Sequence, residues 1–171
     1  MEKQFLTEEN GFYQIDCTNA VWATDAIHQE YHNAGLHIHD VDFLIENDDT
    51  IYLIEYKNAD IPGAASPNSF QPESDKKVEN VVRKYFDSLH YLTLLQKRKR
   101  KHFVYILEYP NGDSTSRKRL RNRLKTELPF ALQRNLSDTV TLIDDIDVLS
   151  IEEWNTHQQL REYPISNVTG S

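Results

Sequence analysis

Apolar residues recur along this chain with two different periods, and the change of period predicts where helices and strands lie. Over residues 75–97 they return every three or four positions, as one face of an amphipathic helix requires. Residues 37–46 and 50–57 are instead rich in β-branched and aromatic residues on either side of a polar turn, which is typical of a hairpin. The expected elements are strands at 11–16, 37–46, 50–57, 102–109 and 139–144, and helices at 19–33, 75–97, 114–127 and 151–161.

Length and element order together indicate one domain. A chain of 171 residues is long enough for a single hydrophobic core. The order of the elements predicts an α/β or α+β fold, with a mixed β-sheet flanked by helices. Residues 59–74, which contain three prolines, form a long loop of the kind that is often functional or mobile. The expected organisation is one domain over 1–162, with a core at 20–109, a helix-strand-helix extension at 114–162 and a tail at 163–171.

Composition limits the classes of protein to which this chain can belong. A hydrophobic fraction of 39% and a charged fraction of 27% are ordinary for a globular domain. The single cysteine, Cys17, excludes an intramolecular disulfide and a cysteine-rich zinc site. No apolar run approaches the ~18 residues of a membrane span, and no basic-then-apolar leader is present. We therefore expect a cytoplasmic protein that does not enter a membrane.

The net charge of −8 conceals a strong segregation of charge along the chain. Residues 76–125 contain 15 of the 19 Lys and Arg against four acids, a net charge of +11, and the remainder carries −19. This asymmetry is compatible with a basic face that contacts phosphates, and equally with the solvated surface of helices. The cations expected to contact nucleic acid are Lys76, Lys77, Arg98, Arg100, Arg117, Lys118, Arg119 and Arg121.

The predicted hairpin carries charged residues within an apolar strand pair. If its turn is centred on residues 48–49, Asp42 lies directly opposite Glu55. Side chains alternate across a strand, so Lys57 shares the face of Glu55 and Tyr56 points to the other face. Two opposed carboxylates repel each other unless a positive charge lies between them. This repulsion requires an explanation.

One explanation is a charge-balanced face exposed to solvent. The same register places Asp40 opposite Lys57, so Lys57 could bridge the carboxylates at the edge of a sheet. However, the neighbouring positions on that face are apolar, namely Leu44, Ile51 and Leu53. The charges therefore lie at the end of a largely buried face, where carboxylates without partners are costly.

A divalent cation is the other explanation. Mg²⁺ takes oxygen ligands, usually one or two carboxylates together with water and phosphate oxygens. Asp42 and Glu55 supply two carboxylates, and a backbone carbonyl at Tyr56 supplies a third oxygen. Lys57 would then stand beside the attacking water, where it can orient that water or offset charge on a phosphate. These residue types in this arrangement indicate hydrolysis of a phosphodiester.

Asp42 followed by Glu55-Tyr56-Lys57, on a hairpin between a helix and a long amphipathic helix, resembles the PD-(D/E)XK nuclease superfamily. The stretch VDFLIENDDTIYLIEYKNA is most similar to Holliday junction resolvase-like and nuclease-related domains. The resemblance covers about residues 20–109 and implies a restriction-endonuclease-like core. It also implies Asp42 and Glu55 as metal ligands and Lys57 as the catalytic lysine. Val41 replaces the proline of the motif.

Many members of this superfamily place a further acid on the first helix, near the metal. Asp25 is the candidate for that acid, and Glu30 is the alternative. The expected function is that of a metal-dependent nuclease with Mg²⁺ or Mn²⁺ as cofactor and nucleic acid, with DNA favoured, as partner. The alternatives are an RNA-directed nuclease and a catalytically inactive nuclease-fold module that binds nucleic acid or acts as a scaffold. A homodimer is left open.

Overall fold

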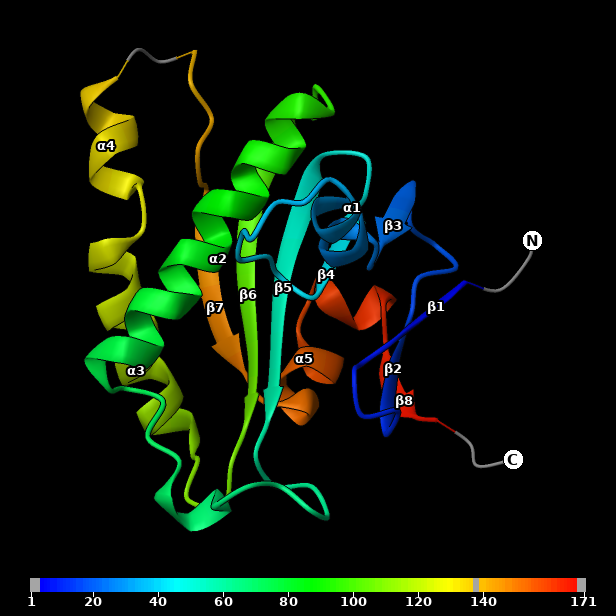
Figure 1. Ribbon diagram of the computed structural model, residues 1–171, viewed down its shortest axis with the longest axis vertical. Coiled ribbons are helices and arrows are strands. Elements are labelled where there is room, and N and C mark those ends of the chain that lie inside the picture. Colours follow the sequence, from blue (N-terminus) through cyan, green and yellow to red (C-terminus); the bar gives the residue numbers. More distant parts are fainter. Residues whose placement is uncertain (1–3, 137–138, 169–171) are drawn as a thin grey trace.

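The computed structural model describes residues 4–136 and 139–168, which form a mixed sheet with helices on both faces (Figure 1). This arrangement confirms the predicted fold class, a single α+β domain. The strands are β1 (Phe5–Thr7), β2 (Tyr13–Asp16), β3 (Trp22–Thr24), β4 (Phe43–Glu46), β5 (Thr50–Asn58), β6 (Arg100–Glu108), β7 (Asp145–Leu149) and β8 (Ile165–Asn167). The helices are α1 (Ile27–Asn33), α2 (Asp75–Leu94), α3 (Ser114–Glu127), α4 (Phe130–Asn135) and α5 (Ile151–Thr156), with 3-10 turns at Pro67–Ser69 and Leu160–Glu162.

Five strands form the central sheet, in the order β3-β4-β5-β6-β7. The first three are antiparallel neighbours, whereas β5, β6 and β7 run parallel. Parallel neighbours need a crossover, which α2 provides between β5 and β6, and α3 and α4 provide between β6 and β7. A second, antiparallel sheet has the order β1-β2-β8.

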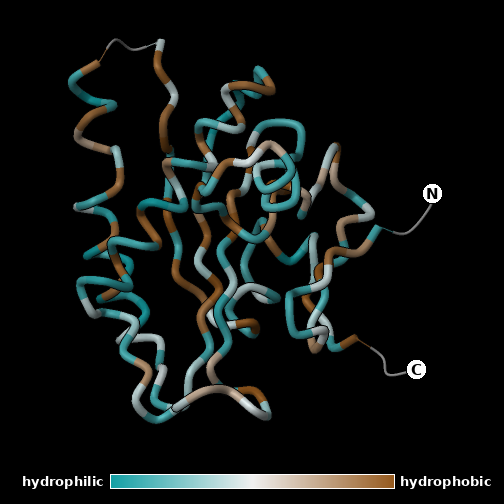
Figure 2. Tube along the Cα trace, in the orientation of Figure 1, coloured by the Kyte–Doolittle hydropathy of each residue, from teal (hydrophilic) through white to brown (hydrophobic). Residues whose placement is uncertain are grey.

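Alternation along the central strands divides the apolar core between the two faces of the sheet. Leu44 and Leu53 pack on the face that α2 and α3 cover. Ile45 and Ile54 pack on the opposite face, against Trp154 of α5. Figure 2 shows apolar and polar segments alternating along α3 and α4, as amphipathic helices require. Among the described residues, no helix is both long enough and apolar enough to cross a membrane.

The predicted register of the hairpin is confirmed. Phe43 pairs with Ile54 and Leu44 pairs with Leu53. The predicted strand at 37–46 is too long, because β4 begins only at Phe43. The backbone N–H of Val41 donates to Ser88 Oγ at 2.9 Å, which attaches the preceding segment to α2 instead of to the sheet.

The predicted helix at 19–33 is wrong in its first half. Residues Trp22–Thr24 form β3, which pairs with β4, and α1 begins only at Ile27. The Trp22 ring lies against Lys97, whose Nζ is 4.3 Å from the ring centroid. The predicted end of the helix is correct, because Gly35 has a φ of 72° and its N–H donates to the carbonyl of His32.

The C-terminal part of the chain differs most from the prediction. The expected strand at 139–144 is absent, because the N–H groups of Leu142 and Ile143 donate to the side chain of Gln133 in α4. The strand β7 begins directly after these residues, at Asp145. The tail predicted from residue 163 is also wrong within the described residues. Tyr163 is buried and β8 pairs with β2, while residues 169–171 lie outside the described chain.

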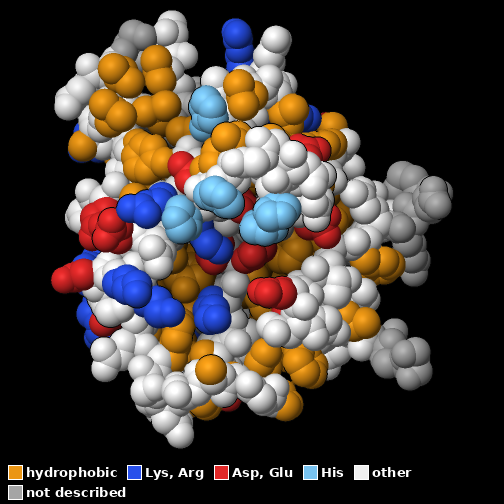
Figure 3. Space-filling view, viewed as in Figure 1, with side chains coloured by type: hydrophobic (Ala, Val, Ile, Leu, Met, Phe, Trp, Pro, Cys, Tyr) orange, Lys and Arg blue, Asp and Glu red, His pale blue; other side chains and the backbone are white. Residues whose placement is uncertain are grey.

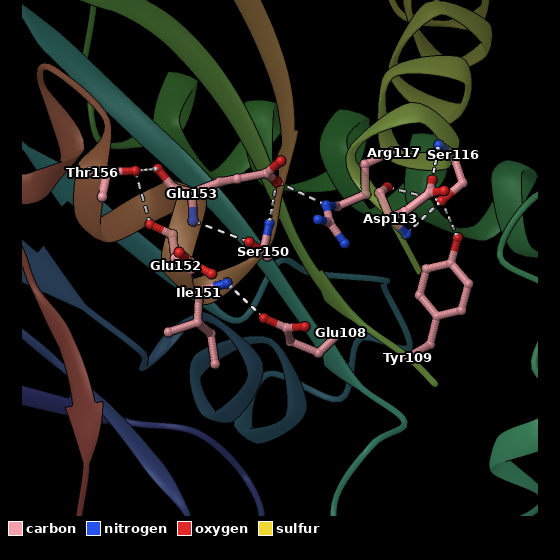
Figure 4. Close-up of polar contacts among 10 residues, drawn as sticks. All are labelled: Glu108, Tyr109, Asp113, Ser116, Arg117, Ser150, Ile151, Glu152, Glu153 and Thr156. Carbon is pink, nitrogen blue, oxygen red and sulfur yellow. Dashed lines mark hydrogen bonds and ion pairs between the residues drawn. The ribbon is translucent and has the colours of Figure 1, made fainter. Parts of the chain in front are cut away.

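Capping boxes begin both α3 and α5 (Figure 4). The α3 helix has the predicted bounds, and its N-cap is Asp113, whose carboxylate accepts from the N–H of Ser116 at 2.7 Å. At α5 the Ser150 hydroxyl accepts from the N–H of Glu153, and Arg117 donates to the Glu153 carboxylate at 2.8 Å. This ion pair joins the starts of two helices that are distant in the sequence.

Candidate functional site

The end of the β4–β5 hairpin brings Asp42 beside Glu55, as predicted. Asp42 immediately precedes β4, and its Oδ2 accepts a hydrogen bond from the backbone N–H of Tyr56 at 2.7 Å. This side-chain bond takes the place of a ladder bond, because the paired part of β4 ends at Phe43. The N–H and C=O of one strand residue point to the same neighbouring strand, so the carbonyl of Tyr56 also faces the side of Asp42.

Glu55 lies on the face of the sheet that α2 covers, and its side chain is only 9% exposed. Lys84 of α2 donates to both of its carboxylate oxygens, at 2.8 and 3.0 Å. Lys84 was not predicted from the sequence as a residue of the site. A signal was present, because Lys84 lies three residues after buried Val81 and four before buried Ser88, on the side of α2 that faces the sheet.

The three charged groups change one another's protonation. Burial raises the pKa of Asp42, and Lys84 only partly opposes this effect. Burial and the neighbouring Asp42 carboxylate raise the pKa of Glu55 to about 8, although Lys84 lowers it. Burial by itself would lower the pKa of Lys84, but the carboxylates of Glu55 and Asp42 outweigh it and raise that pKa. One cation is thus insufficient to keep both carboxylates at their ordinary pKa.

A hollow of about 490 Å³ opens beside this group and is strongly acidic. Figure 3 shows acidic and histidine side chains gathered around it on the face that carries α1 and α2. The lining includes the carboxylates of Glu9, Asp25, Asp40 and Asp42 and the ammonium of Lys84. Glu9 was not identified from the sequence, because it comes from the chain between β1 and β2 and approaches the site only through packing.

The two candidates for the additional acid lie in different surroundings. Asp25 lines the acidic hollow, just before α1 begins at Ile27. Glu30 instead accepts a hydrogen bond from the Tyr91 hydroxyl of α2. The structure therefore brings Asp25, and not Glu30, to the candidate site.

Lys57 lies on the face of β5 that the alternation of side chains predicts, but its expected partner, Asp40, does not lie opposite it. It pairs in register with Leu107, whose side chain belongs to the core under α2, so Lys57 shares the face of Glu55. The predicted opposition of Asp40 and Lys57 is wrong, because the pairing of β4 with β5 begins only at Phe43, and Asp40 instead lies 3.1 Å from His28 Nδ1. Lys57 is exposed and makes no ion pair with any residue of 4–136 or 139–168.

Much of the predicted basic surface is neutralised by acids from other parts of the chain. The prediction that Arg117 contacts phosphate is wrong, because its side chain is only 9% exposed and is bonded to Glu153. Arg100, Arg119 and Arg121 are exposed or half-buried, and each has an acidic partner. The partners are Asp144 for Arg100 at 3.4 Å, Glu73 for Arg119 at 2.7 Å, and Asp145 and Asp147 for Arg121 at 3.6 Å. The remaining predicted contacts, Lys76, Lys77, Arg98 and Lys118, are exposed.

The raised pKa of Glu55 predicts how the stability of the metal-free protein depends on pH. Between the ordinary pKa of 4.5 and about 8 the folded state retains a proton that the unfolded state has lost. The free energy of unfolding should therefore fall as the pH rises through this interval. Asp42→Asn removes the main charged cause of the shift, so we expect a flatter dependence in urea unfolding measured across this interval. Asp49→Asn, at the exposed hairpin turn, should keep the wild-type slope, and an equal slope in both variants would contradict this account.

Comparison with known proteins adds no assignment to this geometry. No protein-family model matches the chain, and no curated protein and no solved structure matches it either. The chemical interpretation of the site therefore depends on its own residues.

Proposed function

We propose that this protein is a metal-dependent phosphodiesterase that hydrolyses nucleic acid, with DNA favoured. The observation that carries the proposal is the pairing of buried Glu55 with Asp42, which lines an acidic hollow. A pair of carboxylates with a raised pKa in a hollow is a candidate functional site on physical grounds. The spacing of Asp42, Glu55 and Lys57 and its resemblance to the PD-(D/E)XK pattern support the choice of phosphodiester chemistry.

The donor set fits Mg²⁺ or Mn²⁺. Asp42 and Glu55 would hold the cation with their carboxylates, and the carbonyl of Tyr56 lies on the side of Asp42. All of these donors are oxygens, which hard divalent cations prefer. The acids that line the hollow outnumber the single ammonium of Lys84, so a bound cation would offset the excess negative charge of the hollow. When bound, such a cation activates water and offsets charge on a phosphate.

The lysines of the site have different roles in this proposal. Lys57 lies on the face of Glu55, is exposed and has no acidic partner among the described residues, so its ammonium is available to a phosphate. Lys84 holds Glu55 in place and offsets its charge. Lys76 and Lys77 are exposed in the first turn of α2, where they can contact a nucleic-acid backbone without reading its sequence.

A binding module that has lost turnover is the second candidate. One observation favours it, because both carboxylates already have partners within the protein. Glu55 is bonded to Lys84, and Asp42 accepts from the N–H of Tyr56. The two candidates differ in whether a divalent cation binds between these carboxylates, and this difference can be measured.

Calorimetric titration with Mn²⁺ tests the proposal. We expect the wild type to bind Mn²⁺ and Asp42→Asn to bind at least about tenfold more weakly, because the loss of a ligand should cost no less than the loss of a supporting group. Asp49→Asn is a matched control at the opposite end of the hairpin and should bind as the wild type does. Equal Mn²⁺ binding by the wild type and Asp42→Asn would contradict the proposed metal site. Cleavage of single-stranded, duplex and branched DNA, and of RNA, would then be measured on the same three proteins.

A further inference from the structure

The other face of the central sheet carries a second group of metal-ligating side chains. We propose that His102, Asp145, Asp147 and His157 form a binding site for a transition-metal ion of the Zn²⁺ class. His102 belongs to β6, the two aspartates to β7, and His157 follows α5. The ion would join two strands and a helix end that are far apart in the sequence. This site is independent of the proposed hydrolysis.

Strand register places three of the four side chains together. His102 pairs directly with Asp145, and Asp147 is two residues further along β7, so all three point to one face. That face is the one on which α5 packs, because Val104, which pairs with Asp147, belongs to the core around Trp154. The end of α5 then brings the fourth side chain, His157, to 3.8 Å from Asp147.

The ligand atoms of His102, Asp145 and Asp147 are close enough together to share one ion, and His157 lies beside Asp147. One ligand atom from each of His102, Asp145 and Asp147 lies within 4.8 Å of the others. Asp147 Oδ2 is 2.9 Å from His102 Nε2 and 3.8 Å from His157 Nε2. Zinc bonds of about 2.0–2.1 Å place tetrahedral ligands roughly 3.3 Å apart, and the two measured distances lie on either side of that separation.

Burial gives the site a closed side and an open side. The His102 side chain is only 8% exposed, whereas the Asp145 side chain is 53% exposed. Asp147 and His157 are intermediate. An ion can therefore enter from the side of Asp145 and reach the buried imidazole of His102.

Arg121 provides the alternative explanation, in which the aspartates are neutralised by an arginine alone. Its side chain is 3.6 Å from Oδ1 of Asp145 and 3.6 Å from Oδ1 of Asp147, which is longer than a hydrogen bond. Its Nε donates instead to the carbonyl of Ile146 at 2.8 Å. Arg121 thus offsets part of the negative charge from the Oδ1 side, while Oδ2 of Asp147 faces both imidazoles.

Ligand chemistry separates this site from the one at Asp42 and Glu55. Two imidazole nitrogens with two carboxylates suit Zn²⁺, Co²⁺ or Ni²⁺, whereas an oxygen-only set suits Mg²⁺ or Mn²⁺. A large excess of Mg²⁺ should therefore leave the site at His102 available. This difference allows the two sites to be measured in one protein.

Titration with Co²⁺ in the presence of excess Mg²⁺ tests the proposal on the intact protein. We expect one Co²⁺ to bind with the visible absorption of a tetrahedral site, and Zn²⁺ to displace it and raise the melting temperature. Asp147→Asn and His157→Gln should each weaken Co²⁺ binding at least about tenfold. His157→Gln is the safer variant, because its side chain is less buried than that of His102.

Two controls decide where the ion binds. Asp42→Asn should leave Co²⁺ binding unchanged, because it alters only the other site. His28→Gln should also leave it unchanged, although His28 stacks on His32 with the ring centroids 6.3 Å apart and lies beside Asp40. Co²⁺ binding that resists both Asp147→Asn and His157→Gln, or no Co²⁺ binding by the wild type, would overturn the proposal.

Discussion

Lys57→Ala is expected to lower the rate of DNA cleavage by about two orders of magnitude or more, the scale typical for the loss of one group that acts in the transition state. The affinities for metal and for DNA should stay within a few-fold of the wild-type values, because Lys57 lies on the face of Glu55 but has no oxygen that could bind the metal. Binding kept and turnover lost would identify an interaction made mainly in the transition state. Single-turnover cleavage with Mg²⁺ and with Mn²⁺ measures the first effect, and calorimetry measures the second.

Lys118→Ala is the matched control for this experiment. Lys118 is an exposed cation on α3, so its removal tests the loss of one positive charge alone. We expect it to change cleavage by a few-fold at most. If the wild type cleaves neither the DNA nor the RNA substrates, or if Lys57→Ala cleaves as the wild type does, the enzymatic proposal fails and the binding module replaces it.

Lys84→Met is expected to destabilise the metal-free protein and to bind Mn²⁺ more tightly than the wild type. Above about pH 8, where Glu55 is ionised, removing one member of a buried ion pair costs about 3–5 kcal/mol, and partial exposure of Lys84 reduces the expected loss to about 2 kcal/mol. The same change removes an ammonium that competes with a cation for both oxygens of Glu55. A gain of about 1.4 kcal/mol in the binding free energy would appear as about tenfold tighter binding.

The two effects are linked, and their combination makes the test specific. Saturating Mn²⁺ should return much of the lost stability to Lys84→Met, because the ion replaces the missing positive charge. Urea unfolding with and without Mn²⁺ measures this recovery. Arg83→Met, one residue earlier on the exposed side of α2, should show neither the loss nor the recovery. Loss of stability without recovery would mean that Lys84 and Glu55 form only a structural ion pair.

The candidate site was largely predictable because its central part is local. Asp42 and Glu55 belong to one hairpin, whose polar turn and alternating side chains determine the register without help from the remainder of the chain. The amphipathic period of α2 is equally local, and its predicted start at residue 75 is correct. These features depend on neighbouring residues, so the sequence contains them directly.

Other parts of the fold were decided by pairing between distant segments. Trp22–Thr24 lie in a stretch with a helical apolar period, yet they become a strand because β4 presents an edge that they can pair with. The segment from residue 163 was predicted as a tail, but β8 pairs with β2 and so joins the second sheet. In each case the gain from a tertiary partner exceeds a weak local preference.

The charged residues show most clearly the difference between what the sequence determines and what the tertiary structure determines. The sequence determined that residues 76–125 carry a net charge of +11, but only the folded chain decided how much of that charge is free. Lys84 meets Glu55 across 29 residues, and Arg117 meets Glu153 across 36. His102 meets Asp147 across 45 residues, which no local spacing indicates. Contacts of this kind depend on which elements pack together, because a side chain can reach only a few ångströms from its own backbone.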